Sequence, residues 1–149
     1  MNVFNAAALA LAAHVLTFQG PAPRPARPLP STALMRIETG VEGEFRQWER
    51  SSAVRLRDVT VTPQTGGALM TVLLTLPRRQ QFEPNAEIAF ERIWNALGRQ
   101  PNAYRELGRI AVSLKRDARE MTVTCSARRV EASKGRSEFA NLKRTCHVN

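Results

Sequence analysis

The most reactive side chains in this sequence are few: two cysteines, Cys125 and Cys146, and two histidines, His14 and His147. Zinc sites place cysteines and histidines at short fixed spacings such as Cys-x-x-Cys, and no such spacing occurs here. A cysteine paired with a histidine can act as a nucleophile. His147, however, stands among the last three residues of the chain. The sequence therefore predicts no metal site and gives little support to thiol catalysis.

Carboxylates offer the other route to catalysis. Glu83, Glu87 and Glu91 follow one another at four-residue steps. They stand where a helix is expected to begin, so they fit the helix dipole and a solvated face better than acid–base work. The sequence contains no P-loop, GxGxxG or GxSxG motif. We therefore predict that the protein is not an enzyme and needs no cofactor.

The two cysteines have two interpretations. Cys125 alternates with Met121, Val123 and Ala127 along an expected strand, which places it toward the core. It is then either a buried free thiol or one half of a disulfide with Cys146. A disulfide would indicate an oxidising compartment. It would close a loop of about 20 residues and stabilise the fold by roughly 3 kcal/mol.

The net charge of +9 comes from 22 basic and 13 acidic residues. It favours acidic partners such as nucleic acid, anionic lipid or an acidic protein surface, although an arginine-rich composition with ordinary solvated faces would also produce it. RNA-binding sheets stack bases on aromatic strand residues, and the expected strands hold Val, Leu, Thr and Met. Nucleic-acid binding is therefore the alternative hypothesis. Its candidate basic patch is Arg55, Arg57, Arg78, Arg79, Lys115, Arg116, Arg128 and Arg129.

The beginning of the chain divides into two parts. Residues 1–19 form an apolar helical segment, and its run from residue 3 to 18 has no Lys, Arg, Asp or Glu. That run is shorter than the roughly 20 residues that cross a bilayer, and it lacks the basic start of a secretory signal. An export signal, a membrane anchor and a helix that packs on a partner all remain open. Residues 20–30 contain five prolines and predict a semi-rigid linker.

Residues 31–130 repeat a helix–strand–strand pattern. A shift of 51 positions, from Leu56 to Leu107, aligns segments 56–76 and 107–127 without a gap. A helical stripe containing Trp48 precedes the first segment, and one containing Trp94 precedes the second. Two αββ units predict an α+β, ferredoxin-like two-layer sandwich with a four-stranded antiparallel sheet and two helices on one face. Residues 131–149 are expected to form a basic C-terminal tail.

The residues on the other face of the sheet are expected to be small and polar, apart from two leucines. These leucines indicate that the N-terminal helix, the tail or a second subunit covers part of it. The candidate partner-binding residues of this face are Leu69, Thr71, Leu73, Thr75, Thr122 and Thr124.

The hairpin VRLRDVTVTPQTGGALMTVLLTLP at 54–77, the aromatic-bearing helices and the second αββ copy resemble one family. It is the periplasmic domain of the M-type inner-membrane component of type II secretion systems, together with related alignment-complex proteins of type IV pilus assembly. The resemblance covers residues 31–128. It implies a non-enzymatic assembly module that forms homo- or heterodimers through sheet edges and helices.

We therefore expect a structural protein of the cell envelope, periplasmic or inner-membrane associated. It would pair with itself or a related αββ protein, and residues 3–18 would provide any membrane association. The alternatives are a basic nucleic-acid-binding ferredoxin-like module and a structural subunit of a larger particle such as a virion.

Overall fold

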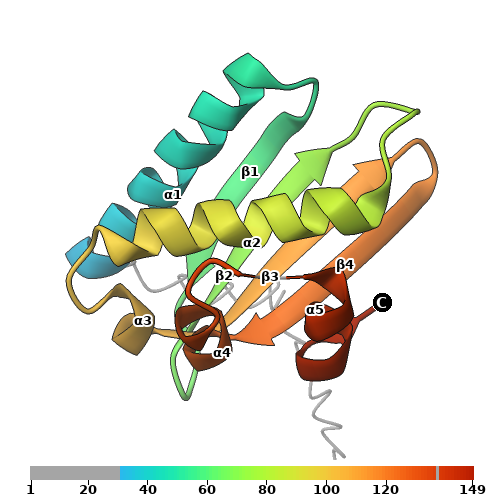
Figure 1. Cartoon of the computed structure of the whole chain (residues 1–149). Helices are drawn as coiled ribbons and strands as arrows, with labels where there is room; N and C mark the ends of the chain where they lie inside the picture. Colours follow the sequence, from blue (N-terminus) through green and yellow to red (C-terminus); the bar gives the residue numbers. More distant parts are fainter. Residues whose placement is uncertain (1–30, 137) are drawn as a thin grey trace, which may run out of the picture.

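The computed structural model describes residues 31–136 and 138–149, so the apolar segment 1–19 and the linker 20–30 lie outside the described residues. Figure 1 shows a sheet with α1 and α2 packed across one face. The elements in chain order are α1 (Thr32–Ser51), β1 (Arg55–Thr62), β2 (Ala68–Thr75), α2 (Phe82–Gly98), α3 (Ala103–Glu106), β3 (Leu107–Arg116), β4 (Arg119–Ser126), α4 (Ala127–Ala132), α5 (Phe139–Thr145) and β5 (His147–Val148).

The α+β class is confirmed, but the expected four-stranded antiparallel sheet is wrong. The sheet has five strands in the order β1-β2-β3-β4-β5. β2 and β3 are parallel, and the other neighbouring pairs are antiparallel. The parallel pair arises because α2 carries the chain back to the starting end of β2, so β3 runs beside β2 in the same direction. The fifth strand comes from the C-terminus.

The two αββ copies are not repeated in space. If a two-fold axis through the sheet related the second hairpin to the first, β4 would lie beside β2 and β3 would lie at the border. Instead β3 lies beside β2, and it is antiparallel to β1 because β1 and β2 are antiparallel. β3 suits the centre since every residue from Ile110 to Leu114 is buried, whereas β4 begins with the exposed Arg119 and Glu120. The turn of the first hairpin therefore lies at one end of the sheet, and the turn of the second hairpin lies at the other end.

α1 forms as its sequence pattern predicts. The Ser31 side chain caps the helix by accepting a hydrogen bond from the Leu34 N–H at 3.3 Å. The predicted apolar stripe is buried against the sheet and α2, and it consists of Leu34, Ile37, Val41, Phe45 and Trp48.

The strand residues predicted to face inward are also buried. They are Val59, Val61, Met70, Val72, Leu74, Leu76, Ile110, Val112, Leu114, Met121, Val123, Cys125 and Ala127. Trp94 differs from expectation because it is only half-buried. Its indole N–H donates to the Glu131 carbonyl at 3.3 Å. Trp94 therefore supports the α4 segment rather than covering the sheet as Trp48 does.

The joint between the two halves requires glycine. Gly67 has φ +112°, and a Cβ there would lie 2.6 Å from the Gly108 nitrogen. A Cβ on Gly108 would in turn lie 2.8 Å from the Gly66 carbonyl oxygen. These contacts are with backbone, which cannot move aside without separating β2 from β3.

The residues expected as a C-terminal tail are folded onto the sheet. Phe139 and Leu142 of α5 are 8% and 6% exposed and join the core. α5 packs against α2, and β5 extends the sheet beyond β4. The folded unit therefore continues to residue 149.

Candidate functional site

The sheet face opposite α1 and α2 is built from alternate residues of four strands; we call it the outward face. The register sets these residues in four rows across β1 to β4: Arg55, Thr75, Lys115 and Glu120; Asp58, Leu73, Ser113 and Thr122; Thr60, Thr71, Ala111 and Thr124; and Thr62, Leu69, Arg109 and Ser126. All six candidate partner-binding residues lie on this one face. No helix of the described residues crosses it in Figure 1.

At the centre of the outward face the side chains are buried and form hydrogen bonds with one another. Ala111 and Ser113 are only 7% and 6% exposed, while Leu73 beside them is 36% exposed. The Thr122 hydroxyl donates to the Ser113 hydroxyl oxygen at 3.1 Å, and Ser113 donates to the Glu120 carboxylate. The Thr122 and Ser113 hydroxyls thus both donate within this network, so covering them leaves neither hydroxyl donor unpaired.

A groove of about 630 Å³ lies at one end of this face. Its lining mixes two cations and two carboxylates with smaller groups: Arg57, Leu73, Leu74, Thr75, Ser113, Lys115, Asp117 and Glu120. This mixed charge suits a polar protein surface more than a bare anion.

The candidate basic patch separates into two groups. Strand register places Arg55, Arg57, Arg78, Arg79, Lys115 and Arg116 at the end of the sheet where β1 starts and β2 and β3 finish. Arg128 and Arg129 follow β4 and lie at the opposite end. The sequence thus marks two basic surfaces rather than one.

Several of these cations have structural partners. Arg78 pairs with Asp117 at 3.3 Å. Arg116 donates to the Gln80 carbonyl, and its guanidinium lies 4.7 Å from the Phe82 ring centroid. Arg129 donates to the Thr145 carbonyl at 2.6 Å. A ligand would therefore meet mainly the exposed Arg55, Arg57, Arg79, Lys115 and Arg128.

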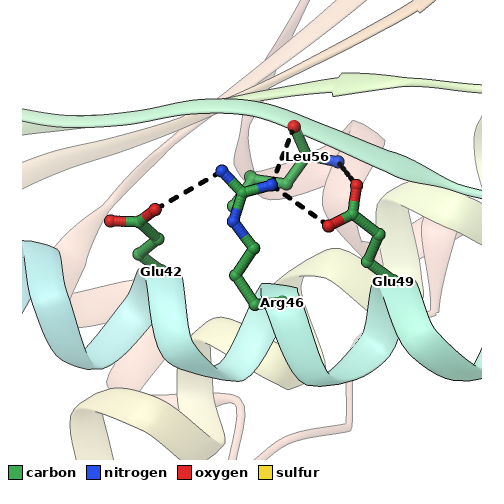
Figure 2. Close-up of polar contacts among 4 residues, drawn as sticks. All are labelled: Glu42, Arg46, Glu49 and Leu56. Atoms are coloured by element: carbon green, nitrogen blue, oxygen red, sulfur yellow. Dashed lines mark hydrogen bonds and ion pairs between the residues drawn. The ribbon is translucent and has the colours of Figure 1, made fainter.

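The border of the sheet at β1 is covered by α1 side chains, and Figure 2 shows part of this cover. Arg46 donates to the Leu56 carbonyl at 3.4 Å, and Glu49 accepts from the Leu56 N–H at 3.2 Å. Farther along β1, the Val61 N–H donates to Glu38 at 2.9 Å. Backbone groups at a free edge would otherwise accept a strand from another chain. β1 is therefore protected against strand addition.

Arg46 also sets the charge state of this cluster. It lies 3.1 Å from Glu49 and 3.4 Å from Glu42. The hydrogen bond from Arg46 is the main cause that lowers the pKa of Glu49, and the same bond raises the pKa of Arg46. Arg46 and Glu49 are thus held in their ionised forms.

The other border is covered by β5, which a disulfide holds in place. Cys125 and Cys146 are bridged, with Cα atoms 4.6 Å apart. The disulfide is therefore confirmed over the buried free thiol. Since both sulfurs are in the bridge, neither is available to pair with His147 as a nucleophile.

The three glutamates of α2 do not gather into a reactive pair. Glu83 and Glu91 are exposed. Glu87 is half-buried, and its carboxylate accepts a hydrogen bond from the Phe139 N–H. Glu87 therefore anchors the start of α5.

Sequence reasoning missed a buried carboxylate between the two long helices. Glu44 of α1 is 5% exposed. It lies 3.0 Å from Arg92 and 3.2 Å from Arg99, although the second contact lacks hydrogen-bond geometry. The available signal was that Glu44 interrupts the apolar stripe beside Phe45. Its position between α1 and α2 indicates a structural role.

Aromatic residues line a hollow of about 390 Å³ near α3. The Tyr104 hydroxyl there is buried and has no hydrogen-bond partner among the described residues. Burial raises the pKa of Tyr104, which keeps the phenol neutral.

Within residues 31–136 and 138–149, no group of three or more His, Cys, Asp or Glu side chains could hold a metal ion. Among the helices of the described chain, none is long and apolar enough to span a membrane. Comparisons of the sequence with protein-family models and curated proteins, and of the fold with solved structures, gave no match.

Proposed function

We propose that this protein is a non-catalytic assembly module of a cell-envelope secretion or pilus-type machine, which pairs with a second copy or a related αββ protein. The observation that carries the proposal is the outward face. On this face Leu73 is exposed next to Ala111 and Ser113, which are buried, and Ser113 is hydrogen-bonded within the face. No described segment packs on it.

The other surfaces of the fold limit where a partner can bind. α1 and α2 fill one face of the sheet, and α1 side chains cover the β1 border. A partner in the oxidised protein therefore has the outward face as its broadest contact.

The disulfide supports the expected location. Structural disulfides persist in oxidising compartments such as the periplasm and are rare in reducing ones. The Cys125–Cys146 bridge is consistent with an envelope protein.

The test is the self-association of the full chain by analytical ultracentrifugation over a range of concentrations. Leu73→Lys places a charge on the outward face and should weaken dimerisation by about tenfold or more, since a desolvated unpaired charge is costly. Ile88→Lys is the matched control because Ile88, on α2, is 37% exposed against 36% for Leu73. A wild-type chain that stays monomeric at all concentrations would overturn self-pairing, and equal effects of both variants would exclude this face.

Nucleic-acid binding is the second candidate, and one observation favours it: six basic side chains meet at one end of the sheet. Binding through phosphates would weaken steeply as salt rises. Replacing Arg55, Arg57 and Arg79 with Gln should then reduce that salt dependence. Arg36→Gln should not, because Arg36 is near the start of α1, at the other end from the start of β1. The outward face carries no aromatic residue for base stacking, which is why assembly is preferred.

A further inference from the structure

The border of the sheet at β4 is covered by a short strand. β5 has two residues, whereas β4 runs over eight, from Arg119 to Ser126. Asn149 and Thr122 exchange two backbone hydrogen bonds of 3.0 Å, and His147 pairs with Thr124. Alternate β4 residues direct their N–H and C=O groups to this border. Glu120 is one of them, and it lies beyond the end of β5.

Residues 138–149, which comprise α5 and β5, form what we call the C-terminal strap. Besides the disulfide and the pairing of β5 with β4, the strap is attached through Phe139 and Leu142 in the core. The Phe139 N–H also donates to the Glu87 carboxylate, and Arg129 donates to the Thr145 carbonyl at 2.6 Å. A cavity of about 50 Å³ under the strap is lined in part by Leu142 and Cys146. A strand pairing of two residues is only marginally stable by itself. The disulfide therefore contributes much of the stability of the closed strap.

The two borders of the sheet differ in what secures them. The cover of β1 consists of side chains from α1, which is a 20-residue helix packed on the core. The cover of β4 is secured by a bond that thiol chemistry can open. Cys125 is 2% exposed, while Cys146 is half-buried and next to exposed residues. Of the two cysteines, Cys146 is therefore the one nearer to solvent.

We propose that the Cys125–Cys146 disulfide is a switch that opens the β4 border to a strand from a partner. Reduction releases the C-terminal strap, and an extended segment pairs antiparallel with β4 in its place. The occupant is a peptide strand with an apolar side chain at the position of Val148, which faces the core side, and a polar one at the position of His147, which faces outward. This is β-strand addition at a sheet edge.

The reductant is a protein or small molecule with two thiols. One of its thiolates attacks the Cys146 sulfur, forming a mixed disulfide and releasing Cys125 as a thiolate that takes up a proton. Its second thiol then attacks the mixed disulfide. The products are the oxidised dithiol and two cysteine thiols in this chain, with two electrons transferred.

Hydrogen exchange of the full chain tests the release of the strap. The Thr122 amide, which donates to Asn149, should exchange about tenfold faster or more after reduction with dithiothreitol, because local opening then exposes it. The Val112 amide in central β3 exchanges through global unfolding, so it should accelerate only as far as loss of the bridge lowers global stability. The double variant Cys125→Ser/Cys146→Ser should show the same pattern without reductant. Unchanged exchange at Thr122, or exchange at Thr122 that is no faster than at Val112 after reduction, would overturn the switch.

A peptide tests whether the open border accepts a strand. The probe has the sequence of residues 143–149 with its cysteine activated as a thiopyridyl disulfide, and the target is the full-chain variant Cys146→Ser. The Cys125 thiolate attacks the peptide sulfur and releases pyridinethione. The control peptide has Pro in place of Asn149 and lacks the N–H that donates to Thr122.

The native peptide should label Cys125 about tenfold faster than the control peptide. Equal rates would show that no strand pairing guides the reaction, and absence of labelling would show that the border stays closed. Both results would overturn the proposal. These readouts do not involve Leu73, so they are independent of pairing through the outward face.

Discussion

The Glu38 carboxylate accepts a hydrogen bond from the backbone N–H of Val61 at 2.9 Å, although 23 positions separate the two residues. The bond joins the first half of α1 to the far end of β1. Together with the bonds of Arg46 and Glu49 to Leu56, it gives the border strand polar partners from its own chain. Natural sheets use such devices to prevent edge-to-edge association.

Removing this bond should destabilise the fold and open the border. Glu38→Ala leaves the Val61 N–H without its partner and should lower the free energy of unfolding by about 1 kcal/mol. Glu42→Ala is the control because Glu42 is exposed and bonds only to Arg46, so it should change stability by less than about 0.5 kcal/mol. Urea denaturation measures both. Equal losses would contradict the role of Glu38.

The cluster around Arg46 should make stability depend on pH. The pKa of Glu49 is lowered from its ordinary value of 4.5, mainly by the hydrogen bond from Arg46. A lowered carboxyl pKa stabilises the fold fully above the unfolded-state pKa, and this contribution disappears as pH falls through the lower folded-state pKa. Glu49→Gln keeps an acceptor for Leu56 but cannot ionise. Unfolding at a series of pH values should therefore show a shallower acid decline in the variant, and parallel curves would contradict this.

The glycines of the sheet joint should be intolerant of a side chain. Gly108→Ala places a Cβ 2.8 Å from the Gly66 oxygen and 3.1 Å from the Gly67 oxygen, and it should cost about 1–3 kcal/mol. Gly43→Ala is the matched control because a Cβ there meets nothing within 4 Å. It lies inside α1 and should stabilise the protein by about 0.5–1 kcal/mol. Thermal unfolding would distinguish these opposite signs.

The buried carboxylate of Glu44 should matter to stability. Glu44→Gln removes the charge facing Arg92 and Arg99 and should cost about 1–3 kcal/mol. The loss stays below that of a fully buried pair because the Arg92 and Arg99 side chains are 31% and 70% exposed and regain water. Chemical denaturation measures the change. A change below about 0.5 kcal/mol, as for a surface pair, would contradict it.

The disulfide should account for a large part of the stability. Thiol titration of the denatured, unreduced chain should find no free cysteine, and reduction should release both. The variant Cys125→Ser/Cys146→Ser should unfold with about 3 kcal/mol less free energy, since its loop is no longer closed. Two titratable thiols before reduction would show that the bridge is absent from the purified protein.

Which face each residue occupies could be predicted from the sequence. The stripe from Leu34 to Trp48 has helical spacing, and the strands alternate, so hydrophobic periodicity predicted most of the apolar side chains that pack between the helices and the sheet. The same alternation set Leu73 and Thr122 on the outward face, where the register later placed them in one row.

Strand order could not be predicted in this way. Alternation states which face a residue occupies but not which strand is its neighbour. The 51-residue repeat favoured a symmetric arrangement that the structure lacks. A better signal was the uncharged run from Ile110 to Leu114, because burial on both faces is typical of a central strand.

Polar contacts between distant elements also could not be predicted from the sequence. Glu44, Arg92 and Arg99 meet only because α1 and α2 pack together, and Glu38 reaches Val61 only after β1 has formed. The C-terminal helices α4 and α5 have six and seven residues, whereas a reliable helical pattern requires roughly eleven. The hydrogen bond from Trp94 to α4 and the packing of α5 on α2 therefore left little trace in the periodicity.

The strand order of the sheet gives its two borders different covers. Related halves joined by an internal two-fold axis through the sheet would give both borders the same cover, and copies could then link into chains border to border. Here β1 and β4 border the sheet under unlike covers, and no rotation exchanges them. A second copy that docks on the outward face finds one place per chain, and an isologous pair closes on itself.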